Sequence, residues 1–576
     1  MEYYIWALII LIILIILVSY WANITLPLDT RSADIVIVGG GTSACIVAYR
    51  LSQRYPEKSI IILERGKDRR NDPIVYNVAN AAIAGYTPPY SEVLPTDFPN
   101  TVVSVASMNG GGSSHNFALS VRGSPNFYNE RWSQVLELSY DDLVRDYFPL
   151  IEAYHPLNPN ESSPTRFKTG KVIMTQLPLT VSISGRIIPL IGAVFREGLQ
   201  VIGQSLEILA NHGPLRASDD FSDHLTRIIA RSKNVPIIPD YNTEVVTCAA
   251  TTPEIFVHNV VGIRQSTDVS YLPRSVIIFD KQGHGKSSFT GEGGKSGIQF
   301  VPNATVTRVS EDIVYWNNGA NKHQTKVNRE GKIIMAAGAI YTPFLLQVSG
   351  FTDNGIGRNL ITHYGCTMIL SVNAENLPPF SSGPLAFVSR YQRDTRDWQL
   401  VVNGTVNKSL LVDIEYPQNT RIFSLILWLL KPRTRGTVRV DGMYPKVDLN
   451  LFEDGTLEDP ESDISSLLDG MRWMYHLAQE LTVPYPTLKP IFPPVEVLQE
   501  NNPLILERYI RQGVSLTDHY CATCQLSSVV NPETFLLRGS DNIHIVDAST
   551  FPEISDGNTN YPVMVMAEIA AKRITL

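Results

Sequence analysis

A glycine-rich turn and a distant acidic residue form the clearest chemical pattern in the chain. Residues 33–66 read ADIVIVGGGTSACIVAYRLSQRYPEKSIIILERG, which predicts a buried strand from Ile35 to Val38, a turn, a helix, and a second strand from Ser59 to Leu63. Glycines 39–41 let backbone N–H groups approach a pyrophosphate at the start of that helix. Glu64 follows the second strand, where it can accept hydrogen bonds from an adenosine ribose. The segment therefore predicts a dinucleotide site.

One position departs from the usual G-x-G-x-x-G pattern. Ala44 stands where the third glycine would be, and its small side chain still permits close packing of the helix on the strand. A glycine-rich turn in an ordinary α/β unit is the alternative interpretation, because the glycine pattern alone is weak. The strand before it, the helix after it and the acid 25 residues beyond Gly39 favour the dinucleotide site.

Length and composition limit the class of protein. The chain has 576 residues, 44% of them hydrophobic and 18% charged, which is typical of a globular protein with two domains or one interleaved pair. The net charge of −8 argues against a nucleic-acid partner, because neutralising phosphates requires a basic face. Five cysteines are too few for a dense disulfide framework and do not identify the compartment.

The amino terminus is a candidate membrane segment. Residues 3–22 read YYIWALIILIILIILVSYWA, and 20 helical residues span about 30 Å, the thickness of a bilayer core. Aromatic residues gather near both ends, as they do at membrane interfaces. We expect a single-pass anchor or signal-anchor, with a short linker to Ser32 after it. Secretion after cleavage of a signal peptide is the alternative, although no Lys or Arg precedes the apolar run.

Several further elements can be placed from local patterns. Ser139 is expected to cap a helix that reads YDDLVRDYFPLIEAY. Residues 333–338 predict a buried strand, and residues 342–349 a helix that Pro343 starts at its first position. The stretch from Asp280 to Gly297 is rich in Gly, Ser and Lys and predicts an exposed loop.

The middle of the chain, residues 367–516, has no cofactor pattern. Alternating apolar runs at residues 421–430 and 436–451 predict strands of a mixed sheet, and we expect the substrate contacts there. Near the carboxyl end, residues 542–547 predict a strand and residues 561–574 an apolar helix.

From Ala33 to its carboxyl end the chain resembles the glucose-methanol-choline (GMC) oxidoreductases, flavoenzymes that oxidise alcohols. The matching segments are GGGSSHNFALSVRG (110–123), AAGAIYTPFLLQVSG (336–350), GIGRNL (355–360), HYCATC (519–524) and NIHIVDASTFPEISDGNTNYPVMVMAE (542–568). They occur in the family's order. The resemblance implies an α/β fold in which a Rossmann-like FAD-binding domain is interleaved with an α+β substrate domain built on a mixed or antiparallel sheet.

The domain boundaries expected from this resemblance are discontinuous. Residues 1–32 form the anchor and linker. The FAD-binding domain is expected to comprise residues 33–135, 200–365 and 530–576. The substrate-binding domain is expected to comprise residues 136–199 and 366–529.

Two residues near the carboxyl end are the catalytic candidates that the resemblance implies. Oxidising an alcohol requires removal of the hydroxyl proton, and His519, with a pKa near neutrality, is the candidate base. Asn558 occupies the place of the family's second His or Asn. Its amide cannot take a proton at neutral pH but can orient the substrate oxygen for hydride transfer to flavin N5. Without the flanking sequences, a loop histidine and a turn asparagine would be the ordinary interpretation.

His115 lies in a Ser-Ser-His-Asn setting in which a family member bonds its histidine covalently to the flavin. A covalent FAD through His115 is therefore a hypothesis, and a histidine packed beneath the flavin without a bond is the alternative. The remaining residues expected to bind FAD are Gly39, Gly40, Gly41, Thr42, Ser43, Glu64, Gly111, Ser113, Asn116, Val306, Asp547 and Ala548. No metal ligand is expected.

Some positions depart from the family pattern. Asn109 replaces an aliphatic residue, Ser120 an aromatic one, and Thr362 stands where the family often has Asp before His363. Cys521 and Cys524 have the spacing of a thiol redox pair, but they lie inside the catalytic segment, which favours two structural thiols. These departures leave the flavin site in place and the substrate open.

The function that we expect is oxidation of the CH–OH group of a small-molecule alcohol, with O2 or another electron acceptor. Two alternatives remain open. An FAD-binding lyase, like the family members that cleave cyanohydrins, would use His519 as a base without net redox change. A structural or surface flavoprotein would keep the fold with little turnover. The shape of the pocket in the middle region decides which alcohol fits.

Overall fold

The structure is a computed structural model of the 576-residue chain. It describes residues 29–576 except 71, 157–162, 177–218, 239, 244–246, 251–253, 256–262, 274–276, 280–284, 288–296, 353–354, 378–381, 391–395, 405, 413, 415 and 417–418. Among these residues no helix is both long and apolar enough to cross a bilayer. The predicted membrane segment, residues 3–22, lies outside them.

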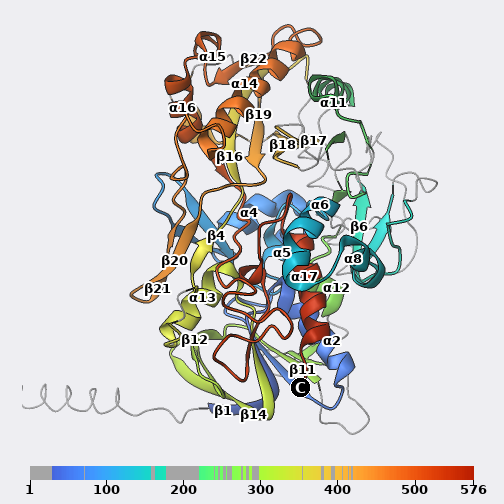
Figure 1. The fold of residues 1–576 in the computed structure, drawn as a ribbon, viewed down its shortest axis with the longest axis vertical. Helices are drawn as coiled ribbons and strands as arrows, with labels where there is room; N and C mark the ends of the chain where they lie inside the picture. The colour runs from blue at the N-terminus through green and yellow to red at the C-terminus, as the bar shows by residue number, and fades with distance from the viewer. Residues whose placement is uncertain are drawn as a thin grey trace, which may run out of the picture.

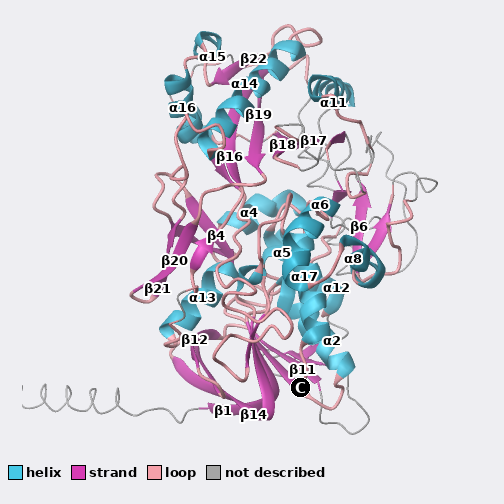
Figure 2. Ribbon diagram, viewed as in Figure 1, coloured by secondary structure: helices cyan, strands magenta, loops and turns pink. Residues whose placement is uncertain are grey.

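A mixed sheet forms the lower half of the molecule in Figures 1 and 2. Its order is β12-β13-β14-β1-β2-β11-β10-β9, and β24 pairs with β14. The strands β11, β2, β1, β14 and β24 run parallel to one another, as in a dinucleotide-binding fold. The bounds are β1 (Asp29–Val38), β2 (Ser59–Leu63), β9 (Ile277–Phe279), β10 (Gly285–Ser287), β11 (Gly297–Val301), β12 (Thr305–Val309), β13 (Ile313–Asn318), β14 (Asn321–Met335) and β24 (Ile543–Ile545).

The predicted strand–turn–helix–strand unit is confirmed. The helix α2 (Thr42–Arg54) follows the glycine turn and packs against α17 (Asn560–Arg573), which comes from the carboxyl end of the chain. Residues Ile35–Val38 and Ser59–Leu63 are almost wholly apolar because helices cover the sheet, and they pair in parallel register from Ile35 with Ile60 to Val38 with Leu63. The strand β1 begins at Asp29, so the linker predicted to reach Ser32 is shorter than expected.

A second, antiparallel sheet forms the upper half of the molecule (Figure 1). Its order is β22-β16-β19-β18-β17-β7, with β23 beside β16. Apolar side chains of α14, α16 and α11 cover it, and α14 contacts both β16 and β19. The bounds are β7 (Cys248–Ala250), α11 (Asp219–Lys233), β16 (Tyr364–Asn373), β17 (Ser382–Val388), β18 (Trp398–Asn403), β19 (Thr420–Leu429), α14 (Asp463–Leu481), β22 (Lys489–Phe492), α15 (Val495–Glu500), α16 (Pro503–Gln512) and β23 (Val514–Leu516).

Smaller elements connect and flank the two sheets. The strands β15, β20 and β21 form one small sheet, β3 and β4 a hairpin, and β5, β6 and β8 another small sheet. The bounds are α3 (Pro73–Tyr76), α4 (Ala81–Tyr86), β3 (Ser91–Pro95), β4 (Val102–Ala106), α5 (Gly112–His115), α6 (Pro125–Phe127), α7 (Ser133–Leu136), α8 (Tyr140–Asp146), α9 (Phe148–Ile151), β5 (Glu152–His155), β6 (Val172–Gln176), β8 (Glu254–Ile255), α12 (Thr267–Tyr271), α13 (Gly338–Val348), β15 (Arg358–Leu360), β20 (Gly436–Asp441) and β21 (Tyr444–Asp448).

The helix predicted after Ser139 is shorter than expected. Its start is as predicted: Ser139 accepts a hydrogen bond from the Asp142 N–H, and the Asp142 carboxylate accepts one from the Ser139 N–H. It breaks at Tyr147, before Pro149, and residues 152–155 form the strand β5. The proline cannot donate within the helix, and β5 finds its backbone partners in β6 instead.

The prediction that Pro343 starts a helix is wrong. The helix α13 begins at Gly338, so Pro343 lies inside it. A proline has no N–H for the carbonyl four residues earlier, which here belongs to Ala339. The Thr523 hydroxyl donates to that carbonyl at 2.6 Å and replaces the missing bond. The loop predicted at residues 280–297 also differs, since Gly285–Ser287 pairs as the strand β10.

Two segments pack in a different half of the molecule from the one that the sequence predicted. Residues 136–151, predicted to belong to the substrate domain, place Leu136, Leu143 and Phe148 in the same core as the strands of the lower sheet. Residues 219–250, assigned to the FAD-binding domain, contribute α11 and β7 to the upper sheet. The strands predicted in the middle region are confirmed as β19, β20 and β21.

Candidate active site

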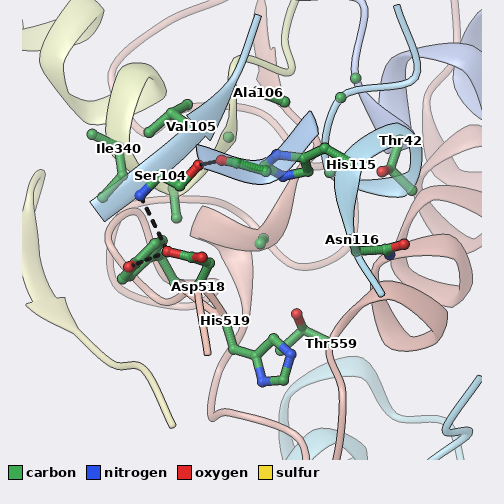
Figure 3. Close-up of a pocket in the computed structure, with 18 of the residues that line it drawn as sticks. Thr42, Ser104, Val105, Ala106, His115, Asn116, Ile340, Asp518, His519 and Thr559 are labelled. Atoms are coloured by element: carbon green, nitrogen blue, oxygen red, sulfur yellow. Dashed lines mark hydrogen bonds between the residues drawn. The ribbon is translucent and has the colours of Figure 1, made fainter. Parts of the chain in front are cut away.

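A cavity of about 1170 Å³ is lined by both halves of the molecule. The ends of β1 and β2 contribute Val38 and Leu63, while β18 and β19 contribute Val401 and Trp428. Both His115 and His519 line the cavity, and Figure 3 shows His115 in the upper part of the view and His519 in the lower part. All the residues predicted to bind FAD line this cavity except Gly40 and Ser113, and both catalytic candidates line it as well.

The glycine turn is built for close backbone approach. Gly39 has φ +95°, and a Cβ placed there would lie 2.6 Å from the Ala336 carbonyl oxygen. A Cβ at Gly40 would lie 2.9 Å from the ring of Phe300, behind the cavity wall. Gly41 is different, because a Cβ there meets no protein atom closer than 3.7 Å. Gly39 and Gly40 are therefore required by the protein itself, while Gly41 leaves free space that faces the cavity.

A second glycine loop rests on the first. The Gly110 N–H donates to the Gly40 carbonyl at 2.8 Å, and the Thr42 hydroxyl donates to the Gly110 carbonyl at 3.3 Å. Gly111 has φ +53°, and a Cβ there would lie 2.7 Å from Gly41 Cα. Ser113 lies behind this contact, where its hydroxyl donates to Gly110. The two loops together form one backbone cradle at the start of α2.

Glu64 holds the turn from the side. One carboxylate oxygen accepts from the Gly40 N–H and the other from the Gly66 N–H, both at 2.7 Å. Burial raises the pKa of Glu64, and these two hydrogen bonds oppose that shift. Each oxygen retains a further lone pair. Acceptance of a ribose hydroxyl by Glu64 stays a prediction that this arrangement permits.

Asp547 joins the carboxyl-terminal segment to the start of α13. Its carboxylate accepts from the Gly338 N–H at 2.9 Å and from the Thr342 hydroxyl at 2.6 Å. It also accepts from the Ser549 N–H at 2.8 Å, which fixes the turn that contains Ala548. The predicted residues Asp547 and Ala548 line the cavity, as Val306 does.

His115 is held in one tautomer. Its Nδ1 lies 3.0 Å from the Ser91 hydroxyl, and that hydroxyl donates its only proton to the Ala84 carbonyl at 2.7 Å. Ser91 must therefore accept from His115, so that Nδ1 carries the proton and Nε2 keeps a free lone pair. Burial, with a smaller effect from Arg264, lowers the pKa of His115 to about 4, which keeps the ring neutral.

Arg264 supports this end of the cavity and has no sequence pattern that identifies it. Its side chain is fully buried and donates to the Asn116 side-chain oxygen at 2.7 Å and to the Val75 carbonyl at 2.9 Å. Burial lowers the pKa of Arg264 to about 10. Arg264 therefore fixes the orientation of Asn116, one of the predicted FAD contacts.

The two catalytic candidates lie together, although 39 residues separate them. Asn558, just before α17, places its Nδ2 at 3.3 Å from Nε2 of His519, which follows β23. The other ring nitrogen of His519, Nδ1, lies 2.9 Å from Nδ1 of His363. Sequence reasoning noted His363 only as a landmark and did not foresee this contact.

His519 does not have the near-neutral pKa that we expected. Burial, and then the nearby His363, lower the pKa of His519 well below 6.5. Burial also lowers the pKa of His363 to about 4, with the Ser555 and Leu430 backbone opposing that shift. Both imidazoles are therefore neutral at physiological pH, and His519 is ready to accept a proton.

Asp518 is a further lining residue that no pattern indicated. It has φ +56° and accepts hydrogen bonds from the Tyr86 and Tyr520 hydroxyls at 2.5 and 2.6 Å and from the Ser104 N–H at 3.1 Å. The last of these bonds is visible in Figure 3. Burial raises the pKa of Asp518. These bonds tie the segment before His519 to α4 and β4.

The cavity residues fit an FAD molecule. The backbone cradle and the start of α2 suit a pyrophosphate, Glu64 suits the adenosine ribose, and His115, Asn116 and His519 line the same cavity. Two family models for GMC oxidoreductases match the chain, at residues 279–365 and 432–567. The chain belongs to the GMC oxidoreductase family. Members of this family bind FAD, and the second match contains both His519 and Asn558.

Known GMC proteins resemble the chain over almost its whole length. It is 22% identical to pyranose dehydrogenase 3 of Leucoagaricus meleagris, over 96% of this chain and 94% of that protein. It is 24% identical to choline oxidase of Arthrobacter globiformis, over 95% of each. It is 23% identical to 5-(hydroxymethyl)furfural oxidase of Methylovorus sp., over 94% of this chain and 98% of that protein.

Solved structures share the fold. Pyridoxine 4-oxidase from Mesorbium loti superposes with a TM-score of 0.69 at 19% identity, covering 94% of this chain and 98% of the other. A formate oxidase variant of Aspergillus oryzae superposes with a TM-score of 0.70 at 18% identity, covering 95% and 98%. The α/β fold with interleaved sheets is therefore that of the GMC oxidoreductases.

The cysteines fit a structural role. Cys521 and Cys524 are buried and form no disulfide, and burial raises the pKa of Cys521 well above its usual value. A buried thiol with a raised pKa is a poor nucleophile. Within the described residues no cluster of His, Cys, Asp and Glu could hold a metal ion.

Proposed function

We propose that this GMC protein oxidises the CH–OH group of an alcohol with bound FAD. The observation that carries the proposal is the meeting of His519 Nε2 and Asn558 Nδ2, 3.3 Å apart, in the cavity that contains the glycine cradle. A neutral imidazole can accept a hydrogen bond from a hydroxyl group while the neighbouring amide donates a hydrogen bond to the oxygen of the same group.

The two side chains would divide the work between them. The alcohol would donate its hydroxyl hydrogen to His519 Nε2 while its oxygen accepts from Asn558 Nδ2. His519 then takes the proton as the carbon loses a hydride, and Asn558 keeps the oxygen in place. FAD bound in the cavity would supply the acceptor for that hydride at its flavin N5. General-base catalysis of this kind contributes about 10²–10⁴-fold in rate.

The relatives support this chemistry. Choline oxidase, 5-(hydroxymethyl)furfural oxidase and pyridoxine 4-oxidase are named as oxidases, and two relatives as pyranose dehydrogenases. We propose an alcohol as the substrate class and O2 or another molecule as the final electron acceptor. Apolar side chains of β17–β19, including Leu385, Val401 and Ile426, line the side of the cavity that would contact the alcohol.

Anaerobic mixing with a panel of alcohols tests the proposal. Bleaching of the flavin absorbance by at least one alcohol is the expected result. A flavin that stays oxidised with every alcohol, together with cleavage of a cyanohydrin, would favour the lyase alternative. No reaction of either kind would favour a structural flavoprotein.

We further propose that His115 Nε2 would form a covalent bond to a methyl carbon of the flavin, with loss of one methyl hydrogen as a proton and transfer of two electrons to the flavin, which the electron acceptor would then remove. The tautomer fixed by Ser91 leaves this atom with a free lone pair, and the low pKa of His115 keeps it unprotonated. Acid-denatured protein should retain yellow colour in the pellet, and Ser91→Ala should lower the retained fraction. Complete release of flavin from the native protein would contradict the covalent bond without touching the proposed oxidation.

We also propose that residues 3–22 anchor the protein in a membrane. Twenty residues without a charged side chain support this assignment. The full chain should stay with membranes after alkaline carbonate washing, whereas a chain lacking residues 1–28 should be released. Release of the full chain would favour a cleaved signal peptide or no anchor.

A further inference from the structure

Gln399 is a buried amide with a single side-chain hydrogen bond to the active site. It lies on β18, between Phe387 of β17 and Trp428 of β19, and is fully buried. Its Nε2 donates to Asn558 Oδ1 at 3.1 Å. Its Oε1 accepts no hydrogen bond from the part of the chain that the structure describes. An unpaired amide oxygen in a core costs stability, so packing alone does not explain this side chain.

The bond from Gln399 ties the orientation of the Asn558 amide to that of the Gln399 amide. With Oδ1 turned to Gln399, the Nδ2 group of Asn558 faces His519 Nε2 at 3.3 Å. An amide nitrogen can only donate. His519 Nε2 must therefore be the nitrogen with the lone pair, which is the form that can accept a substrate proton.

We propose that Gln399 is a positioning residue that keeps His519 in its base form through Asn558. The inference rests on the proposed oxidation and adds a residue to it. With Nε2 free, the ring proton of His519 lies on Nδ1, from which it is donated to His363 Nδ1 at 2.9 Å. The direction of each hydrogen bond, from Gln399 through Asn558 and His519 to His363, then follows from the one before it.

The reversed orientation would have the opposite effect. If Asn558 Oδ1 faced His519 Nε2, it would stabilise a proton on that nitrogen. The base would then be blocked, and the pKa of His519 would rise. While the Gln399 amide keeps its orientation, its donor group disfavours this state, because it would meet the donor group of Asn558.

Gln399→Glu imposes the reversed orientation, because an ionised carboxylate only accepts hydrogen bonds. Gln399→Leu removes the bond with little change in volume. We expect Gln399→Leu to slow anaerobic flavin reduction by about 10-fold, the effect of one lost hydrogen bond. We expect Gln399→Glu to slow it by about 10²-fold or more at pH 7, as loss of the base would. Only Gln399→Glu should move the acidic limb of the pH profile to higher pH.

Nitrogen-15 NMR of the histidine rings provides a readout besides activity. The signals of His519, assigned by their loss in His519→Ala, should show an unprotonated Nε2 in the native protein and a protonated Nε2 in Gln399→Glu. A native flavin content and melting temperature in each variant would exclude misfolding as the cause. Leu400→Met, on the same strand, is the control for altered packing. In an Asn558→Ala background, Gln399→Glu and Gln399→Leu should no longer differ, because the coupling runs through Asn558.

Two results would overturn the inference. One is a Gln399→Glu protein with native rates and an unmoved pH profile, which would mean that Asn558 already has the reversed orientation. The other is an equal loss in Gln399→Glu and Gln399→Leu with Nε2 unprotonated in both, which would indicate packing only. Failure of the proposed oxidation is distinct, since the native protein itself would then show no flavin reduction with any alcohol.

Discussion

His519 and His363 face each other through their Nδ1 atoms, 2.9 Å apart, with their ring planes at 86°. Only one of the two nitrogens can carry the proton in this contact. Because Asn558 donates to Nε2 of His519, the proton lies on His519 and His363 accepts it. By accepting that proton, His363 supports the tautomer that Asn558 sets and holds the His519 ring in its direction, although it does not line the cavity.

Replacing His363 tests this support. His363→Leu removes the acceptor, and we expect flavin reduction to slow by roughly 10-fold, the effect of one net hydrogen bond. His363→Asn can still accept through its side-chain oxygen and should recover most of the rate. Stopped-flow flavin reduction measures both. Equal rates in the two variants would show that the accepting atom does not matter.

The pH dependence of activity follows from the low pKa of His519. A base acts in its unprotonated form, and burial with the nearby His363 lowers the pKa of His519 well below 6.5. We therefore expect kcat/KM to stay level from pH 8 down to about 6.5 and to fall only at lower pH. A half-maximal value near or above pH 6.5 would contradict the neutral histidine pair.

The stability of the fold should also depend on pH, because buried histidines have lowered pKa values. His115, His363 and His544 each have a pKa lowered to about 4. Between about pH 6.5 and 4 these histidines bind protons when the chain is unfolded but not when it is folded, so stability is complete above pH 6.5 and is lost as the pH falls. Each can contribute up to about 1.4 kcal/mol per pH unit in that window.

Chemical denaturation at several pH values measures this loss. His544, which lies on β24 outside the cavity lining, provides the control. His544→Gln should reduce the slope of unfolding free energy against pH and leave the rate of flavin reduction unchanged. A stability that is flat between pH 6.5 and 4 would contradict the lowered pKa values.

A substitution at Gly41 should abolish cofactor binding and leave folding intact. A Cβ at Gly41 meets no protein atom within 3.7 Å, so Gly41→Val should fold while its side chain occupies the space of the pyrophosphate. The purified variant should be colourless with a native circular dichroism spectrum. Gly39→Ala, with its Cβ 2.6 Å from the Ala336 oxygen, should instead be destabilised. A fully yellow Gly41→Val protein would place the pyrophosphate elsewhere.

Local patterns in the sequence were sufficient to predict the elements that depend on residues close together in the chain. The strand Ser59–Leu63 and the cap at Ser139 follow from apolar runs and short-range hydrogen bonds, and the structure has both as predicted. Pro343 was misplaced because its missing hydrogen bond is replaced by Thr523, 180 residues later in the chain. No local pattern contains such a partner.

The active site also contains residues that the sequence indicated and residues that it did not. His519 and Asn558 could be proposed because recognisable segments surround them. Gln399 and Arg264 could not, since an amide within an apolar strand and an arginine in a loop carry no pattern. Their importance lies in which atoms they bond, Asn558 Oδ1 and Asn116 Oδ1, and that is a property of the folded chain.

The proposed oxidation requires His519 to take the hydroxyl proton of the alcohol. The most direct test is the rate of anaerobic flavin reduction by the best alcohol of the panel, compared between the native protein and His519→Ala with matched flavin content. The rate should fall by at least about 10²-fold in His519→Ala, following the magnitude of general-base catalysis. An unchanged rate in that variant would contradict the role of His519 as the base.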